Sequence, residues 1–188
     1  MRLVIMGPPG AGKGTQAEAL ARRIEGAHIS TGDIFRDNVS RQTELGRTAQ
    51  RYMDAGEYVP DSVTNAMVRD RLAQPDARDA FLLDGYPRTP DQVAELDSIL
   101  SDLGTQLDAA LALTVDPEEL IARLLKRAET SGRSDDTEDV IRHRQEVYAA
   151  ETAPLLNVYR ERGLLVEVDG MGSVDEVAAR IDAALPKG

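Results

Sequence analysis

Residues 7–16, GPPGAGKGTQ, are the stretch of the sequence best suited to chemistry. Gly7, Gly12 and Lys13 fit the phosphate-loop pattern G-x-x-x-x-G-K-[ST]. Gly14 takes the place of the usual hydroxyl residue, and a threonine follows one position later. Glycines let backbone N–H groups converge on an anion, a helix N-terminus adds positive dipole, and a lysine adds charge for the outer phosphates. A chance glycine-rich turn is the alternative, but the apolar segment before the loop and the helical pattern after it favour phosphate binding.

An acid and an arginine follow each of two other apolar segments, in FLLDGYPR and in STGDIFR. The first supplies Asp84 and Arg88, and the second supplies Asp33 and Arg36. Because the carboxyl ends of parallel strands meet at one edge of a sheet, we expect both pairs at the edge that carries the glycine loop. Turn and helix-cap roles for the two acids are the simpler alternatives. Beside a phosphate loop, however, an acid at a strand end is typical of magnesium binding, so the sequence predicts two acids for one magnesium ion.

Four arginines flank or occupy a polar, turn-forming segment at residues 127–136, which we expect to be a short exposed loop between two helices. They are Arg123, Arg127, Arg133 and Arg144. A solvated helix face is the ordinary explanation for such arginines. In a chain with a formal net charge of −11, however, arginines on both sides of a flexible loop suit a polyanionic ligand, because the guanidinium fork matches phosphate oxygens.

The sequence offers no evident covalent nucleophile and no evident general base. No Ser–His or Cys–His pair suggests a nucleophile, and His28 and His143 lack ligand-like spacing, so we assign neither histidine a role. A hydroxyl acceptor usually needs a base, whereas a phosphate monoester, with a second pKa of about 6, is already an anion near neutral pH. Arginines and magnesium would then act by positioning and charge neutralisation. These features favour phosphoryl transfer from a nucleoside triphosphate to another phosphate.

These side chains need a scaffold that brings them to one edge, and the hydrophobic pattern predicts it. Strands are expected at residues 2–6, 27–30, 80–84, 110–115 and 164–168. Helices are expected at residues 33–54, 61–73, 90–102, 117–128, 137–162 and 174–185, the first with a break near Gly46. We expect Asp61 to cap the second helix, and Ser173 and Glu176 to form a capping box at the last. Continuous apolar strands that alternate with helices predict a three-layer α/β fold with a doubly wound, five-stranded parallel sheet. Residues 30–60 hold two helical patterns without a strand, which indicates an inserted helical lobe.

Composition limits the partners. The chain has 188 residues, of which 41% are hydrophobic and 29% charged, as in an ordinary globular domain. The acidic balance argues against nucleic acid or an anionic membrane as the main partner. The sequence has no cysteine, which excludes disulfides and thiolate metal sites, and its first apolar run is too short for a signal peptide or a membrane span. We therefore expect a cytoplasmic protein.

Several ordered motifs together are more specific than any one of them. They are GPPGAGKGT, STGD with Arg36, DGYPRT with Gln92, GRSDD, and IRHRQEVY with Arg144. From Met1 to about residue 185 the chain resembles the adenylate kinases of the nucleoside monophosphate kinase family, in which a glycine followed by threonine after the loop lysine is the usual form. The resemblance implies Mg²⁺-dependent transfer between ATP and AMP to give two ADP, a P-loop core, a nucleoside-monophosphate-binding (NMP-binding) insertion, a short lid, and a monomer.

The resemblance also implies positions for each part. The core would be residues 1–29, 60–126 and 137–188, with the NMP-binding insertion at 30–59 and the short lid at 127–136. The ATP site would be formed by Gly10, Ala11, Gly12, Lys13, Gly14, Thr15, Arg127 and Gly172. The AMP site would be formed by Thr31, Arg36, Glu57, Tyr58, Val59, Gly85, Tyr86, Pro87, Arg88, Gln92, Arg133 and Arg144. The catalytic cations would be Lys13, Arg88, Arg123, Arg133 and Arg144, and Asp33 and Asp84 would hold Mg²⁺ through water.

Other readings of the same motifs are weaker. Many bacterial members have a longer lid, in some cases with a zinc site of Cys or Cys/His type, but this short, cysteine-free segment predicts no structural zinc. A UMP/CMP kinase usually has Ala and Asn at the positions of Thr31 and Gln92, so these two residues favour AMP. A nucleotide-binding switch would not need the acceptor-side arginines Arg36 and Arg88, and a catalytically dead scaffold would not need to retain Lys13.

Overall fold

The computed structural model describes residues 1–186 of the chain. Across these residues the strands form one parallel sheet in the order β2-β3-β1-β4-β5. The strands are β1 (Arg2–Met6), β2 (Ala27–Ser30), β3 (Phe81–Asp84), β4 (Ala109–Thr114) and β5 (Leu165–Asp169). The five predicted strands are confirmed to within one residue at each end. Because β1 is central and the chain winds outward on both sides, the loops after β1, β2 and β3 open at one edge of the sheet.

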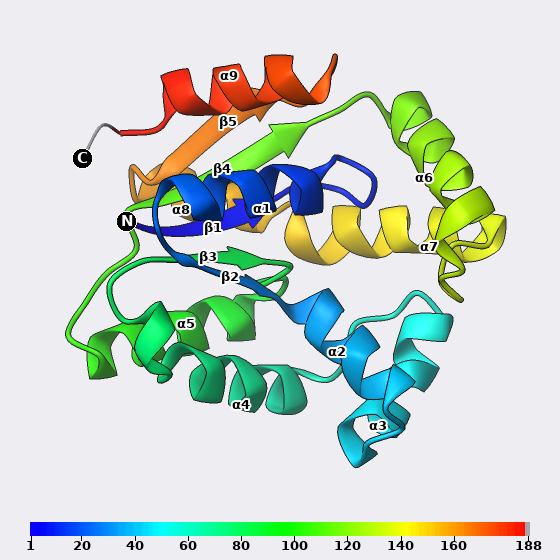
Figure 1. The fold of residues 1–188 in the computed structure, drawn as a ribbon, viewed down its shortest axis with the longest axis horizontal. Coiled ribbons are helices and arrows are strands. Elements are labelled where there is room, and N and C mark those ends of the chain that lie inside the picture. Colours follow the sequence, from blue (N-terminus) through cyan, green and yellow to red (C-terminus); the bar gives the residue numbers. More distant parts are fainter. Residues whose placement is uncertain (187–188) are drawn as a thin grey trace.

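Helices cover both faces of this sheet (Figure 1). Within the described residues they are α1 (Lys13–Arg23), α2 (Thr31–Ser40), α3 (Glu44–Asp54), α4 (Asp61–Leu72), η1 (Pro75–Ala77), α5 (Pro90–Asp102), α6 (Pro117–Ser131), α7 (Glu138–Val147), η2 (Tyr148–Thr152), α8 (Leu155–Glu161) and α9 (Val174–Ala184). Helices α1 and α9 pack with Leu3 and Ile5 of β1, and helices α4, α5 and α8 pack with Val4 and Met6. Alternate residues of one strand are therefore buried on opposite faces, as the continuous apolar pattern predicts. No helix of residues 1–186 has the length and apolar character that a membrane span needs.

Helices α2 and α3 stand away from the sheet, beyond the carboxyl end of β2 (Figure 1). They pack on each other around a small cluster with Phe35, Ala49 and Val59 at its centre, against which Val63 and Met67 of α4 also pack. The break predicted near Gly46 is present but lies a few residues earlier, between Ser40 and Glu44, and Gly46 itself lies inside α3. A Cβ on Gly46 would overlap the backbone of Asn38, so this glycine allows two helices to approach closely.

The exposed loop predicted at residues 127–136 is also wrong in its extent. Helix α6 continues through Arg127, Ala128 and Glu129, which are good helix formers, to Ser131 and ends at Gly132, whose φ of 61° is the left-handed conformation common after a helix. The loop that remains is not wholly exposed, because Asp135 and Asp136 are 7% and 5% exposed. The segment is therefore a helix end followed by a short turn with two buried carboxylates.

The single helix predicted over residues 137–162 is interrupted. Helix α7 passes into the π-helical turn η2, where the Ala153 N–H donates to the Tyr148 carbonyl at 2.9 Å, five residues back. Pro154 follows and has no N–H to continue the hydrogen-bond ladder, so α8 begins as a separate helix. The capping box of Ser173 and Glu176 at α9 is confirmed.

Candidate functional site

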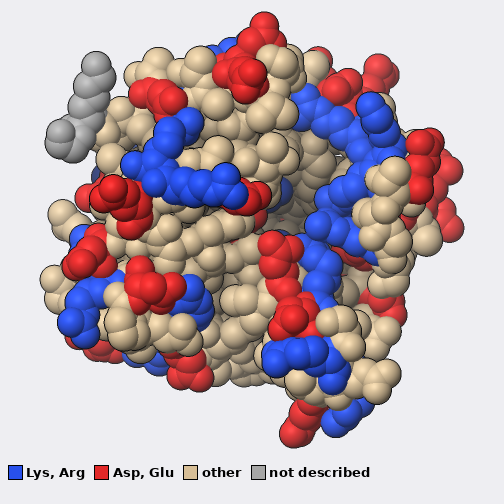
Figure 2. Space-filling model, in the orientation of Figure 1, with Lys and Arg blue, Asp and Glu red and all other residues tan. Residues whose placement is uncertain are grey.

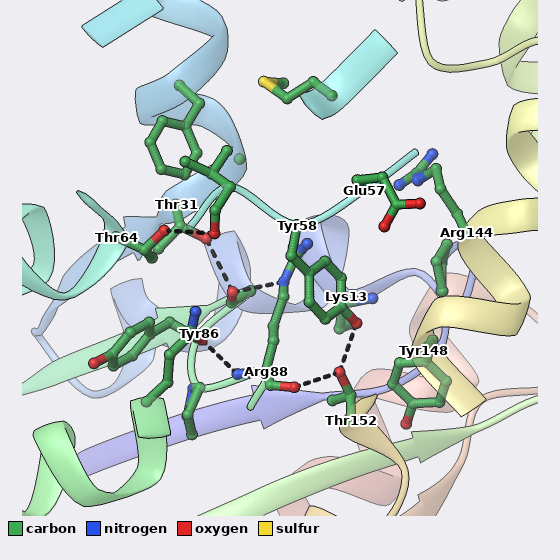
Figure 3. Close-up of a pocket in the computed structure, with 18 of the residues that line it drawn as sticks. Lys13, Thr31, Glu57, Tyr58, Thr64, Tyr86, Arg88, Arg144, Tyr148 and Thr152 are labelled. Carbon is green, nitrogen blue, oxygen red and sulfur yellow. Dashed lines mark hydrogen bonds between the residues drawn. The ribbon is translucent and has the colours of Figure 1, made fainter. Parts of the chain in front are cut away.

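One pocket opens at the carboxyl edge of the sheet and collects residues from distant parts of the chain (Figure 3). Its lining includes Lys13 and every residue of the predicted acceptor site except Arg133. These residues come from α1, α2, the segment between α3 and α4, the turn after β3, α5 and α7. Three apolar side chains, Phe35, Met53 and Val59, line the side of the pocket near α2 and α3.

The glycine loop joins β1 to α1 and ends in a left-handed turn. Gly10 and Gly12 each have a φ of 89°, and Gly12 is the N-cap of α1. The Lys13 ammonium donates to two neutral carbonyls of the same loop, Gly7 at 2.9 Å and Pro8 at 3.1 Å. Burial lowers the pKa of Lys13 to about 8, although the nearby Asp84 carboxylate opposes this shift. The lysine charge is thus held in place at the start of a helix, where an anion would also meet the helix dipole.

The rest of the predicted phosphate-binding stretch lies at the same helix start. Gly14 and Thr15 are exposed at the first turn of α1, and Ala11 is buried beside them. Gly172, with a φ of 100°, lies outside the pocket in the turn before α9. Arg123 links this turn to the loop, because its guanidinium donates to the carbonyls of Gly170 at 3.1 Å and Ala11 at 3.5 Å.

The two predicted metal-binding acids have different surroundings. Asp84 is 8% exposed at the end of β3, and its Oδ2 lies 3.7 Å from Nε2 of His28. Contact with Asp84 raises the pKa of His28, a residue to which the sequence assigned no role. Asp33 is more exposed and forms an ion pair with Arg36 at 2.7 Å; partial burial opposes it, but this partner lowers the pKa of Asp33. Within the described residues, no group of three or more His, Asp or Glu side chains could enclose a metal ion.

Arg88 is oriented by several neutral contacts. Its Nε donates to the Gly85 carbonyl at 2.7 Å, and its backbone N–H donates to Oε1 of Gln92 at 2.7 Å. Its guanidinium also lies over the Tyr58 ring, 5.2 Å from the ring centre. Among residues 1–186 its two terminal nitrogens have no hydrogen-bond acceptor, so they remain available to an anion in the pocket.

Other predicted acceptor-site residues hold this arrangement together. The Thr31 hydroxyl donates to the Gly85 carbonyl at 3.0 Å. The Gln92 amide donates to Asp61 at 2.9 Å, and Asp61 also accepts from Thr89. Asp61 was expected to cap α4, and that prediction is wrong, because it is the first residue of the helix and makes no cap. Tyr86 and Pro87 line the same wall of the pocket.

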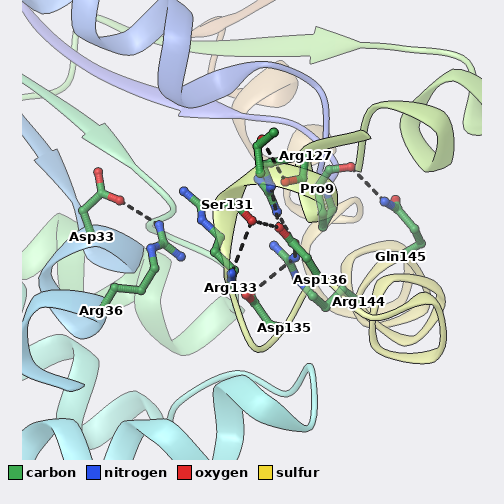
Figure 4. A network of polar contacts seen from close by, with 11 residues as sticks. Pro9, Asp33, Arg36, Arg127, Ser131, Arg133, Asp135, Asp136, Arg144 and Gln145 are labelled. Atoms are coloured by element: carbon green, nitrogen blue, oxygen red, sulfur yellow. Dashed lines mark hydrogen bonds and ion pairs between the residues drawn. The ribbon is translucent and has the colours of Figure 1, made fainter. Parts of the chain in front are cut away.

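Arg127 of α6 and Arg144 of α7 meet two carboxylates in the loop between these helices (Figure 4). Arg127 forms a two-fold contact with Asp136, whose side chain is only 1% exposed. Arg144 lies 3.4 Å from Asp135 and 3.5 Å from Asp136, and burial lowers its pKa to about 10. Arg127 and Arg144 are therefore paired with carboxylates, in contrast to Arg88.

Arg133 differs from its neighbours in α6 and α7. Its side chain has no hydrogen-bond acceptor among residues 1–186, and Figure 4 shows it between Arg36 and the two carboxylates. Burial, followed by the charges of Arg36 and Arg127, lowers its pKa. Figure 2 shows lysine and arginine gathered along one side of a hollow in this face, where Figure 1 places α6 and α7. A chain that is acidic overall therefore presents a cationic wall to this hollow.

Sequence reasoning missed several residues of this site. Asp135 and Asp136 carried a signal, because two adjacent acids beside an arginine-rich segment indicate ion pairs. Gln145 donates to the Pro9 carbonyl at 2.8 Å, and His143 contacts Glu57. These contacts carried no sequence signal, since the partners lie 136 and 86 residues apart.

The arrangement suits two anions that face each other. A glycine loop with a lysine lies on one side, Arg88 and Arg36 lie on another, Arg144 lines the same pocket, and Arg133 lies beside Arg36 (Figure 4). Among residues 1–186 the carboxylates that line the pocket are Glu57, which contacts His143, and Asp135, which contacts Arg144, so neither is free to act only as a base. The site can therefore neutralise and align phosphates, which is what phosphoryl transfer between two anions needs.

Comparison with known proteins gives one consistent result. A family model described as "Adenylate kinase" matches residues 5–164. The chain is 62% identical over 185 residues to the adenylate kinase of Nocardioides sp., which covers 98% of this chain and 97% of that protein. It is 61% identical over 186 residues to the adenylate kinase of Kocuria rhizophila, with 99% of both chains covered. It is also 57% identical over 185 residues to that of Thermobifida fusca, with 98% of both covered.

Proposed function

The chain belongs to the adenylate kinase family, and we propose that it transfers the terminal phosphoryl group of ATP to AMP, giving two ADP. One observation carries this proposal: Lys13 of the glycine loop and the arginines Arg36, Arg88 and Arg144 line the same pocket. A protein that only bound or hydrolysed ATP would not need a second set of cations opposite the loop. The uncompensated guanidinium of Arg88 supports a second phosphate-bearing substrate.

On the donor side, the backbone N–H groups of residues 10–15 would surround the ATP phosphates, and Lys13 would bind the outer ones. Arg123 and Arg127 would approach the same phosphates from α6, and Gly172 would lie near the adenine. The contact of Arg123 with the Ala11 carbonyl supports this placement, because it brings the arginine to the loop.

On the acceptor side, Arg36 and Arg88 would bind the AMP phosphate. The adenine would lie against Thr31, Val59 and Gln92, beside the segment of Glu57 and Tyr58, and close to the turn of Gly85, Tyr86 and Pro87. The apolar wall of Phe35, Met53 and Val59 supports a base at this position.

In the transfer step Arg133 and Arg144 would contact the phosphoryl group as it passes between the two substrates. Because the acceptor oxygen is already anionic, no residue has to remove a proton from it. The barrier would be lowered by alignment and by cations fixed before the reaction begins. Closure of the segment at 127–136 over the pocket would exclude water as a competing acceptor.

The residues present fit a magnesium ion that is held mostly by phosphates and water. Asp84 lies beside the glycine loop, since a Cβ on Gly14 would lie 3.9 Å from its Oδ2. Asp33, in the motif STGD, offers a second carboxylate. Two carboxylates without a third are consistent with Mg²⁺, which keeps several waters and binds substrate phosphates. When bound, the ion would neutralise charge on the phosphates during transfer. Asp33 and Asp84 would orient its water ligands.

We also propose the division into a core, an NMP-binding insertion at 30–59 and a short lid at 127–136. The apolar cluster centred on Phe35, Ala49 and Val59, which packs α2 and α3 on each other and against α4, supports the insertion as a unit. A cytoplasmic monomer without nucleic-acid, membrane or zinc partners would fit the acidic, cysteine-free composition.

An acceptor panel tests the proposed function. ATP and Mg²⁺ are supplied with AMP, CMP, UMP, dTMP or GMP, and with no acceptor, and ADP formation is measured for each. We expect the highest kcat/KM with AMP and little ADP without an acceptor. Equal or faster turnover of UMP or CMP would identify a pyrimidine nucleotide kinase, and tight ATP binding with no transfer to any acceptor would favour a nucleotide switch.

A further inference from the structure

Thr152 lies at the end of the π-helical turn η2 and joins two parts of the acceptor pocket (Figure 3). It is 3% exposed. Its hydroxyl donates to the backbone carbonyl of Arg88 at 2.9 Å and lies 2.6 Å from the Tyr58 hydroxyl. The partners are 64 and 94 residues away in the sequence, so this contact depends wholly on the fold.

The chemistry of the hydroxyl determines the direction of both hydrogen bonds. A threonine hydroxyl has one proton, and a carbonyl oxygen can only accept. Since Thr152 donates its proton to the Arg88 carbonyl, it must accept the proton of Tyr58. The three groups therefore form one ordered chain, Tyr58 to Thr152 to Arg88.

This chain completes the support of Arg88. The Arg88 backbone N–H donates to the Gln92 side chain, its backbone carbonyl accepts from Thr152, and its Nε donates to the Gly85 carbonyl. The Tyr58 ring, fixed through its hydroxyl, covers the guanidinium from one side. Every one of these contacts leaves the terminal nitrogens of Arg88 facing the pocket.

The π-helical turn accounts for the position of Thr152. A π turn contains an additional residue compared with an α turn, and such turns are frequent at functional sites. Here the wide turn is made just before Pro154, and it carries Thr152 between the segment after α3 and the turn after β3.

We infer that Thr152 is a positioning residue for the acceptor phosphate: its hydroxyl fixes Arg88 through the backbone and Tyr58 through the phenol. The inference rests on the proposed function, in which Arg88 binds the AMP phosphate. It assigns Thr152 no contact with the reacting atoms. Its effect should therefore appear in AMP affinity, with ATP affinity unchanged.

The test compares Thr152→Val, which keeps the shape and removes the hydroxyl, with Thr152→Ser, which keeps the hydroxyl. For the valine variant we expect AMP Kd by calorimetry and AMP KM to rise about tenfold, because a buried hydrogen bond is lost and two polar groups are left unpaired. ATP KM should stay within about twofold, and the serine variant should return AMP Kd to within about threefold of the parent protein. Ile99→Val serves as a control: it trims a side chain in the apolar core and should lower Tm without changing AMP Kd.

Tyr58→Phe approaches the same chain from its other end. It should raise AMP Kd in the same direction, and the double variant with Thr152→Val should be no weaker than Thr152→Val alone, because both remove one shared hydrogen bond. If Thr152→Val does not fold, Tyr58→Phe and Thr152→Ser decide the question. Unchanged AMP Kd in a folded Thr152→Val or in Tyr58→Phe would overturn the inference while leaving the kinase function intact. A parent protein that does not bind AMP would instead refute the proposed function.

Discussion

Two regions of the pocket hold their cations in different ways. In the sheet-edge region, residues 7–15 and 84–92, Lys13 contacts backbone carbonyls and Arg88 contacts a carbonyl and an aromatic ring. In the arginine-rich region, residues 123–144, Arg127 and Arg144 contact the buried carboxylates Asp135 and Asp136. The first region gives Lys13 and Arg88 no ion-pair partner, whereas the second pairs Arg127 and Arg144 with carboxylates and leaves only the Arg133 side chain without an acceptor among residues 1–186.

The difference suggests how the two regions serve the reaction. Uncompensated cations that are already oriented attract an anion without rearrangement, as a preorganised site requires. Cations that are paired with carboxylates must exchange partners before they can contact a phosphate. Such an exchange would tie the use of these arginines to the arrival of substrate, which would protect ATP from water.

The largest expected effect is the loss of Arg88. We expect Arg88→Ala to lower kcat/KM for AMP by about 10² or more, because an oriented charge in a water-poor site is removed. Steady-state kinetics with AMP varied would measure this loss. Arg127→Ala is the matched variant from the arginine-rich region, and its loss of kcat/KM for AMP should be at least tenfold smaller than that of Arg88→Ala. A loss below about threefold for Arg88→Ala would remove the distinction between the two regions.

The second effect concerns the carboxylate that neutralises Arg127. Asp136→Asn should lower the free energy of unfolding by about 2 kcal/mol at pH 7, less than for a fully buried pair because Arg127 is about a third exposed. Burial alone would raise the pKa of Asp136, but hydrogen bonds and charge from Arg127 lower it below the ordinary 3.8. Its contribution to stability is therefore present above pH 3.8 and is lost as the pH falls through the lower folded pKa. Urea unfolding at several pH values should show the two proteins converging below that range.

Asp76→Asn is the control for this prediction. Asp76 also makes two contacts with an arginine, Arg71, at 2.7 Å, but its side chain is 57% exposed. The same substitution should therefore destabilise the protein much less at this site. Equal losses at the two positions would show that burial of Asp136 does not strengthen its pair.

The sequence was sufficient to predict the features that local pattern controls. The five strands, the glycine loop with Lys13, and the helix at 90–102 follow from apolar periodicity, glycine content and caps, all read over a few residues. The helix ends near Gly46 and Gly132 were misjudged because glycine serves two purposes. At Gly46 it permits close helix packing, and at Gly132 it ends a helix that had already continued past the predicted boundary.

The polar contacts between distant segments could not be predicted in the same way. A lone Thr152 in a helical stretch carries no signal for a bond to Arg88, because only the fold brings them together. The pairing of Arg127 with Asp136 is different, since both lie in one short motif and their opposite charges suggest it. Residue type thus indicated the ligand class, while the way each cation is held required the structure.

The third prediction uses the different pKa values of Lys13 in the sheet-edge region and Arg144 in the arginine-rich region. Burial places the pKa of Lys13 at about 8, despite the opposing Asp84 charge, whereas Arg144 has a pKa of about 10. We expect kcat/KM for ATP to fall about tenfold per pH unit above pH 8, because this parameter reports the free enzyme and the neutral lysine binds phosphate poorly. kcat should change less, since bound phosphate favours the charged lysine. Lys13→Arg should lack this alkaline limb, and a limb that persists in it would assign the titration to another group.

The smallest expected effect concerns the contact between His143 of the arginine-rich region and Glu57 of the insertion. Nε2 of His143 on α7 is 2.5 Å from Oε1 of Glu57, and its Nδ1 is 3.6 Å from Glu146. The hydrogen bond with Glu57 raises the pKa of His143 above 6.5, so the stabilisation is fully present below pH 6.5 and is lost as the pH rises through the folded value. The Tm difference between the parent protein and His143→Gln should thus be largest near pH 6 and shrink as the pH rises through the folded pKa of His143. Glu57→Gln should abolish this pH dependence, and Glu146→Gln should only reduce it.

Because His143 and Glu57 are 41% and 49% exposed, 0.5 M salt should remove most of the difference, whereas the effect of Asp136→Asn should persist. If salt left the His143 effect unchanged, the contact would have to be counted with the buried pairs of the arginine-rich region.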